Sequence, residues 1–190
     1  LAADQDLAVQ KLPYKKLRKR LLAQRQVLEL HEVSEFPSGM GSIAPRSLPG
    51  IVLDDASAKL KGDWARSTNF KPYIGNGYIF NGKKGSKSKG DGKANATFRF
   101  KVPKSGVFQL LMAYSAHETR ARNVPVTVVS GSRTIGFNVD QTQPLPSGKQ
   151  FKPLGKVRLE SDVETRITIN NKGTEGFVIV DALQRLPVNQ

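Results

Sequence analysis

The sequence contains no cysteine, only two histidines and a single tryptophan among its 190 residues. The absence of cysteine excludes a disulfide scaffold, a thiolate zinc site and a cysteine nucleophile. The histidines, His31 and His117, lie far apart and give no His-x-x-x-His spacing for a metal site. No apolar run approaches the about 20 residues that a membrane-spanning helix needs. The chain is therefore not predicted to span a membrane or to bind a metal through cysteine or histidine.

Catalytic motifs are equally scarce. No Gly-x-Ser-x-Gly elbow is present, and Ser115, His117 and Glu118 stand too close in sequence to converge as a triad. The glycine-rich stretches at 75–77 and 85–92 do not lead from a strand into a helix, so they are not phosphate-binding loops. We therefore predict that this chain alone is not an enzyme. A structural calcium ion is left open, because several aspartates offer oxygen ligands without an EF-hand spacing: Asp54, Asp55, Asp91, Asp140 and Asp181.

Positive charge dominates the chain, which carries a formal net charge of +14, and residues 50–190 hold 22 basic and 11 acidic side chains. The lysines are densest in a stretch rich in glycine and serine, which contains Lys83, Lys84, Lys87, Lys89 and Lys93. This composition is typical of a solvated hairpin tip, and it also fits an electrostatic contact with a polyanion. No aromatic residues are interleaved for base stacking, so an acidic polysaccharide fits better than nucleic acid.

Residues 1–49 differ from the remainder of the chain. The pattern predicts a helix from Pro13 to Leu30, with a stripe of leucines on one side and basic residues over much of the rest. Such a helix fits packing on a neighbouring domain better than binding to a membrane surface. Residues 31–49 contain regularly spaced proline and glycine and are predicted to be a linker. We therefore predict a domain boundary near residue 50.

From Gly50 onward the hydrophobic pattern has a period of two. Ala94 to Val102 alternates between apolar and polar residues, and a turn at 103–106 leads into the apolar run Val107 to Tyr114. Further strands are expected at 50–54, 62–67, 78–81, 124–130, 133–140, 154–160, 163–170 and 176–186. No helical pattern interrupts this series. The sequence therefore predicts an all-β fold over 50–190, an antiparallel β-sandwich of jelly-roll type preceded by the N-terminal helix and linker.

Aromatic and basic residues are the candidates for a binding site. Exposed aromatic rings can cover the apolar side of a sugar, while polar neighbours bond its hydroxyl groups. The alternative for the single tryptophan is a place in the core. The candidate carbohydrate-binding residues are Trp64, Tyr73, Tyr78, Lys83, Lys84, Lys87, Lys89 and Arg120. Asp181 interrupts an apolar run, so we expect it to have a structural role through hydrogen bonds.

The ordered motifs of residues 50–187 resemble those of the golvesin-like domain, also called the xanthan-lyase carbohydrate-binding-like domain. The resemblance rests on Val52-Leu53-Asp54-Asp55, Gly62-Asp63-Trp64, Tyr73-Ile74-Gly75-Asn76-Gly77-Tyr78, Val102-Pro103-Lys104-Ser105-Gly106, Arg120-Ala121-Arg122-Asn123 and Gly176-Phe177-Val178-Ile179-Val180-Asp181. One departure is Phe151, close to Leu154-Gly155, where the family often has a tryptophan. The resemblance implies a β-sandwich accessory module that binds carbohydrate.

Residues 8–28 resemble the end of a bacterial FAD-dependent oxidoreductase, a protein in which this helix commonly precedes a golvesin-like domain. This resemblance implies that FAD, if bound at all, belongs to an upstream part of a parent protein, and that this chain holds no cofactor. Because the chain opens at Leu1 without a methionine, we expect it to be part of something longer.

Together these features predict a non-catalytic module at the C-terminus of an exported, extracytoplasmic bacterial enzyme. Its expected partner is an acidic polysaccharide rather than nucleic acid. The alternative is a structural domain that packs on its parent enzyme and binds no glycan of its own.

Overall fold

The structure is a computed structural model that describes residues 41–82 and 90–188. The predicted helix Pro13–Leu30 and the candidate residues Lys83, Lys84, Lys87 and Lys89 lie outside the described residues. Among the residues that are described, no helix has the length and hydrophobicity needed to cross a bilayer.

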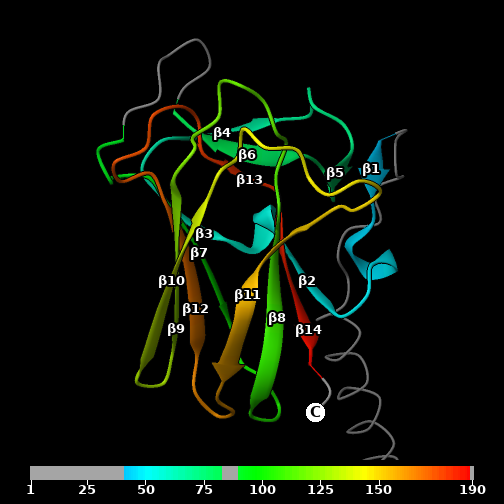
Figure 1. Cartoon of the computed structure of the whole chain (residues 1–190), viewed down its shortest axis with the longest axis vertical. Helices are drawn as coiled ribbons and strands as arrows, with labels where there is room; N and C mark the ends of the chain where they lie inside the picture. Colours follow the sequence, from blue (N-terminus) through cyan, green and yellow to red (C-terminus); the bar gives the residue numbers. More distant parts are fainter. Residues whose placement is uncertain (1–40, 83–89, 189–190) are drawn as a thin grey trace, which may run out of the picture. The chain divides into compact units, whose positions relative to one another are not determined.

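Two antiparallel sheets form the layers of a sandwich (Figure 1). The five-stranded sheet has the order β10-β9-β12-β7-β3 and the four-stranded sheet the order β11-β8-β14-β2. The first consists of β3 (Lys59–Lys61), β7 (Asn95–Phe100), β9 (Val124–Ser130), β10 (Arg133–Val139) and β12 (Thr165–Asn170). The second consists of β2 (Ile51–Asp54), β8 (Gly106–Ala113), β11 (Lys152–Leu159) and β14 (Ala182–Pro187). The antiparallel β-sandwich predicted from the sequence is confirmed.

The main core lies between these sheets and follows from the period-two pattern. In β7 the side chains of Ala96 and Phe98 are buried, whereas Thr97 and Arg99 point outward. Leu110 of β8 joins the same core from the other sheet. Because alternate residues of a strand face opposite sides, a strand that reads apolar–polar buries one face and exposes the other.

A third sheet of order β13-β6-β4 closes one end of the sandwich, at the top of Figure 1. Its strands are β4 (Trp64–Ser67), β6 (Tyr78–Asn81) and β13 (Ile179–Val180). Tyr78, Ile79 and Ile179 are buried in the main core, so this sheet caps the apolar interior.

The segment 41–49, which the sequence analysis assigned to the linker, is ordered against the sandwich. β1 (Ser42–Ile43) pairs in parallel with β5 (Tyr73–Ile74), and the 3-10 helix η2 (Pro45–Ser47) follows. A second apolar cluster, on the outer face of the four-stranded sheet, includes Leu48 together with Ile74, Ala113, Phe151 and Ala182. The proline-containing segment 41–49 therefore packs on an apolar surface and is not a flexible linker.

The run predicted as one strand over 176–186 is two strands that belong to different sheets. β13 pairs with β6, whereas β14 pairs with β8 and β2, and Asp181 lies between them. The main-chain N–H of Ile74 donates to both Asp181 carboxylate oxygens, at 3.0 and 3.2 Å. The expected structural role of Asp181 is confirmed: its carboxylate ties β5 to the point where the chain changes sheets.

Asp55 accompanies Asp181 in this buried region, at the start of the 3-10 helix η3 (Asp55–Ser57). Its main-chain N–H donates to the Asp181 carbonyl at 2.8 Å, and its carboxylate pairs with Arg66 at 3.0 Å. Burial, reinforced by Asp54, raises the pKa of Asp55 to about 8 against the opposing effect of Arg66. Burial also raises the pKa of Asp181 well above its usual value. The fold therefore holds two carboxyl groups whose ionisation is unfavourable in the native state.

Gln141 joins three separate segments of the chain. Its fully buried side-chain amide accepts from Ile179 N–H at 2.8 Å and donates to the Ile179 carbonyl at 2.7 Å. Its main-chain N–H donates to the Ala121 carbonyl at 2.9 Å, and its own carbonyl accepts from His117 N–H at 3.4 Å. Gln141 therefore fixes the loop 117–121 relative to β13.

We expect Gln141→Leu to lower the free energy of unfolding by about 2–4 kcal/mol, because two buried main-chain groups of Ile179 lose their partners. Urea unfolding followed by fluorescence measures the change. The control is Gln143→Leu at an exposed position two residues away, for which a change below about 0.5 kcal/mol is expected. Equal stability losses in the two variants would contradict this role of Gln141.

Stability should also depend on pH. Because the pKa of Asp55 is higher in the folded state than in the unfolded chain, the folded state binds more protons between about pH 4 and 8. The free energy of unfolding should therefore fall as pH rises through this range, and Asp55→Asn should make the fall shallower. Urea unfolding at pH 5 and pH 8 tests this, with Asp63→Asn at an exposed position as the control. A wild-type protein more stable at pH 8 than at pH 5 would refute it.

Candidate functional site

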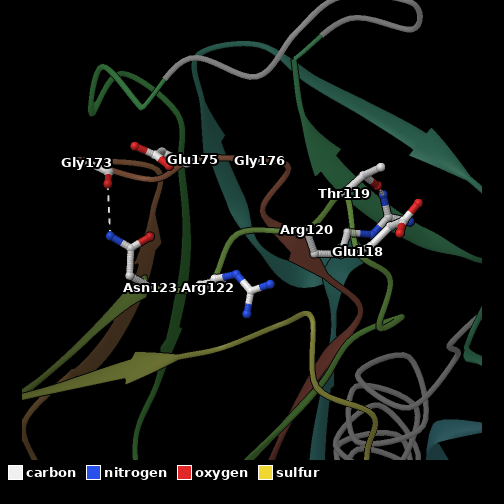
Figure 2. Close-up of a pocket in the computed structure, with 8 residues that line it drawn as sticks. All are labelled: Glu118, Thr119, Arg120, Arg122, Asn123, Gly173, Glu175 and Gly176. Carbon is white, nitrogen blue, oxygen red and sulfur yellow. Dashed lines mark hydrogen bonds between the residues drawn. The ribbon is translucent and has the colours of Figure 1, made fainter.

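A polar pocket of about 410 Å³ lies where two loops meet at one end of the sandwich. One loop connects β8 to β9 and the other connects β12 to β13. The lining residues, shown as sticks in Figure 2, are Glu118, Thr119, Arg120, Arg122, Asn123, Gly173, Glu175 and Gly176. The pocket thus gathers two carboxylates, two guanidinium groups, a hydroxyl and an amide.

Main-chain hydrogen bonds fix the two loops to each other. Phe177 N–H donates to the Thr119 carbonyl at 3.0 Å, and Ala121 N–H donates to the Phe177 carbonyl at 2.9 Å. Asn123 adds a side-chain bond of 2.9 Å to the Gly173 carbonyl, drawn as the dashed line in Figure 2. The pocket is therefore built from ordered backbone rather than from two independent loops.

Gly176 permits this close approach. Its φ is +103°, and a Cβ atom there would lie 2.7 Å from the Arg120 carbonyl carbon and oxygen and 2.8 Å from the Thr119 oxygen. Any other side chain would push the loops apart, because the atoms in the way are main chain. The glycine before Phe177 is thus a condition for the shape of the pocket.

Arg120 is the most constrained cation of the pocket. The residue is only 9% exposed, and burial lowers the pKa of its guanidinium, with nearby Tyr78 opposing the shift. Nε donates to the Ser115 carbonyl at 3.3 Å and Nη1 to Thr119 Oγ1 at 3.4 Å. The other terminal nitrogen, Nη2, has no hydrogen-bond partner within the described parts of the chain. A guanidinium held in this way can donate to a ligand without first being ordered.

Phe70 extends the site beyond the pocket. Its ring is 38% exposed, the Arg120 guanidinium carbon lies 4.9 Å from the ring centroid, and the His117 ring contacts it edge-on at 5.2 Å. The ring lies in the loop between β4 and β5. An exposed aromatic face supported by a cation is suited to the C–H side of a sugar ring.

Arg122 stands on the opposite, exposed side of the pocket. Its guanidinium lies 3.9 Å from the Asp140 carboxylate, a long ion pair in which the Arg122 side chain is mostly exposed. The hydroxyl of Thr142 bonds Asp140 and holds the pKa of that carboxyl below its usual value, with Arg122 contributing. A weakly paired, exposed guanidinium can exchange this partner for an anionic ligand.

The structure separates the predicted site residues. Arg120 lies in the pocket as a candidate binding residue. Tyr78 is only 2% exposed and belongs to the core, so the prediction of an exposed sugar platform there is wrong. Trp64 and Tyr73 are half-buried and pack against the same core, and the Trp64 indole N–H donates to the Lys61 carbonyl at 3.0 Å. Trp64 and Tyr73 are partly exposed and stay candidate residues.

Sequence reasoning missed Phe70, Glu118 and Glu175. A signal for Phe70 was available, because an aromatic residue inside the polar, proline-containing stretch 67–72 falls in a loop, where rings are exposed more often than in strands. The two glutamates had no comparable signal. That both line one pocket depends on the pairing of two loops that are far apart in the sequence.

The catalytic and metal candidates do not converge. His117 Nδ1 bonds the Thr119 hydroxyl at 2.9 Å, and Ser115 Oγ is buried without a partner in the described chain, so no triad forms. The aspartates left open as calcium ligands instead accept hydrogen bonds from protein N–H groups, as the carboxylates of Asp91 and Asp181 do. Among the described residues, no group of three or more metal-ligating side chains of histidine, cysteine, aspartate or glutamate is found.

A two-layer antiparallel sandwich with a polar pocket on its end loops has the architecture of a small binding module. The model of the Golvesin C-terminal domain family matches residues 51–185, so the chain belongs to that family. No curated protein sequence matches the chain significantly.

Solved structures share the fold. A Paenibacillus xanthan lyase is 29% identical with a TM-score of 0.63, and the match covers 73% of this chain and 13% of that one. A Podospora anserina GH26-CBM35 β-(1,4)-mannanase is 18% identical with a TM-score of 0.53, covering 74% and 28%. The domain Xyl-CBM35, solved with a glucuronic acid-containing disaccharide, is 17% identical with a TM-score of 0.50, covering 73% and 94%. This chain therefore spans a small part of the first two proteins and nearly the whole of the third.

We expect Gly176→Ala to lower the free energy of unfolding by about 2 kcal/mol or more, because strained backbone and a main-chain clash act together. The matched control is Gly148→Ala, where φ is +68° and nothing lies within 4 Å of the new methyl group. That control should cost only the backbone term of about 1 kcal/mol. Thermal unfolding of both variants measures the difference, and a Gly176→Ala protein as stable as the control would contradict the close-packed pocket.

Proposed function

We propose that this domain is a non-catalytic carbohydrate-binding module of a larger exported bacterial enzyme, and that its ligand is an acidic polysaccharide. The observation that carries the proposal is the pairing of an exposed aromatic ring, Phe70, with the buried guanidinium of Arg120 at the edge of a polar pocket. In this arrangement the ring covers the apolar side of a sugar, and the pocket groups bond its polar edge.

The planar donors of the pocket, rather than its net charge, favour a uronic acid over a neutral sugar. Arg120 and Arg122 offer planar donors that match a carboxylate, while Glu118 and Glu175 accept from sugar hydroxyl groups. Arg120 is held in place before binding, so little conformational entropy is lost when it donates to a ligand.

The comparisons support carbohydrate as the ligand class. The family match, the likeness to part of a xanthan lyase and the shared fold of a CBM35 domain solved with a glucuronic acid-containing disaccharide are each consistent with it. The small share of the lyase that the match covers fits a module within a larger polypeptide. Export, and therefore an extracytoplasmic location, belongs to the same proposal.

Two earlier expectations stay predictions. The segment that resembles an FAD-dependent oxidoreductase lies outside both the described residues and the family match. An FAD-binding part upstream of this chain therefore stays a prediction. Lys83, Lys84, Lys87 and Lys89 remain candidate contacts from sequence. They precede Gly90, whose carbonyl accepts from N–H of the pocket residue Gly173 at 2.8 Å.

Isothermal titration with a glucuronic acid-containing disaccharide tests the proposed site. We expect Phe70→Ala to weaken binding about fivefold, because the loss of an aromatic contact costs about 1 kcal/mol. The matched control is Ile51→Ala, which shortens another exposed apolar side chain, on β2, and should leave affinity unchanged. Arg120→Lys keeps the charge and removes the planar donors, so it should also weaken binding. Absence of binding by the wild type, or equal affinity in all variants, would refute the site.

A further inference from the structure

The outer face of the five-stranded sheet is strongly basic along three adjacent strands. Its exposed cations are Lys59 and Lys61 of β3, Arg99 of β7, Arg166 of β12, and Lys101, which follows the last residue of β7. One carboxylate, that of Glu164, lies among them and bonds Arg99. We call these five cations the basic sheet face.

The strand register places like charges side by side. Arg99 and Arg166 are direct cross-strand partners in the β7–β12 pair, and both are exposed. Like charges directly opposite each other destabilise a sheet. A single carboxylate does not neutralise five cations, so this face carries an unfavourable charge density that an anionic partner would relieve.

The remaining outward side chains of β7 and β12 are small and polar. Thr97 and Thr168 lie opposite each other with their hydroxyl oxygens 3.2 Å apart, and Asn170 donates to Asn95 one row further along. Hydroxyl and amide groups in flat rows offer donors and acceptors to the hydroxyl groups of a sugar chain.

The side chains of the face favour a polysaccharide over single-stranded nucleic acid. The outward-facing residues of β3, β7 and β12 include no aromatic side chain on which a base could stack. The three strands that carry the cations, spaced by about 4.8 Å, span about 10 Å. An extended sugar chain needs no groove and can lie flat across the strands.

The basic sheet face is also continuous with the pocket. β12 runs from Arg166 through Thr168 to Asn170, and three residues later Gly173 lines the pocket. A polymer with one of its sugar units bound in the pocket can therefore extend over the cations of the sheet. The unit in the pocket can be at the end of the polymer or within it.

We propose that the basic sheet face is a second binding surface, for an extended carboxylated polysaccharide, which adds electrostatic affinity to the pocket. The choice of polysaccharide rests on the proposed function, while the charge and register of the face are independent of the pocket. In this arrangement the pocket recognises single sugar units and the face recognises the charge of the polymer.

Affinity electrophoresis with polygalacturonate tests the proposal. The face variant is Lys59→Gln/Lys61→Gln/Lys101→Gln, and the control variant is Lys104→Gln/Lys149→Gln/Lys156→Gln, which changes the net charge equally at exposed lysines elsewhere. We expect the face variant to bind the polymer about tenfold more weakly, with a smaller dependence on salt, and the control to differ by less than about twofold. Equal weakening in both variants would overturn the proposal, because it would reflect net charge alone.

Two further arms separate this surface from the pocket and from other polyanions. The face variant should bind the disaccharide of the pocket experiment as the wild type does, whereas Phe70→Ala should lose disaccharide affinity and keep the salt-dependent share of polymer binding. Loss of disaccharide binding in the face variant would overturn a separate surface, and absence of disaccharide binding by every protein would refute the pocket alone. Duplex DNA retained as strongly as polygalacturonate would favour nucleic acid and overturn the polysaccharide assignment.

Discussion

Gln141 provides the hydrogen bonds on which the upper end of this domain depends. Its side-chain amide presents a donor and an acceptor to Ile179 much as a neighbouring strand would, and its main chain holds the loop 117–121. One buried side chain thereby provides the hydrogen bonds that a neighbouring strand would give to β13, which lies in the third sheet rather than in the two main layers. Since Phe177 and Ala121 bond each other across the pocket, the position of both loops follows from this junction.

The apolar core and the candidate binding surfaces are located in different parts of the molecule. The apolar residues between the sheets supply most of the burial, whereas the pocket is formed by loops and by backbone that a glycine allows to approach closely. The outer face of the five-stranded sheet contributes little to the core, so charged side chains there do not disturb the apolar packing. The outward sheet face can therefore vary without loss of the sandwich, whereas the pocket loops depend on Gly176 and Gln141.

Most of the sandwich could be predicted from the sequence, because alternation along strands such as β7 and β9 reports burial directly. The change of sheet at Asp181 could not, since one polar residue within an apolar run is compatible with one strand or with two. The binding residues were harder. Trp64, Tyr73 and Tyr78 suggested a platform, yet Tyr78 is buried and the other two pack partly against the core. Arg120 lines the pocket, and Phe70 beside it was not among the candidates from the sequence. Which rings face outward depends on long-range packing that no local pattern encodes.

The pairing of β1 with β5 determines where this domain can be truncated. A unit cut at Gly50 would uncover Ile74, Ala113, Phe151 and Ala182 on the outside of the four-stranded sheet. This exposed apolar patch would make the truncated domain prone to self-association. A fragment that keeps this patch covered therefore has to include residues 41–49, although the family match begins only at residue 51.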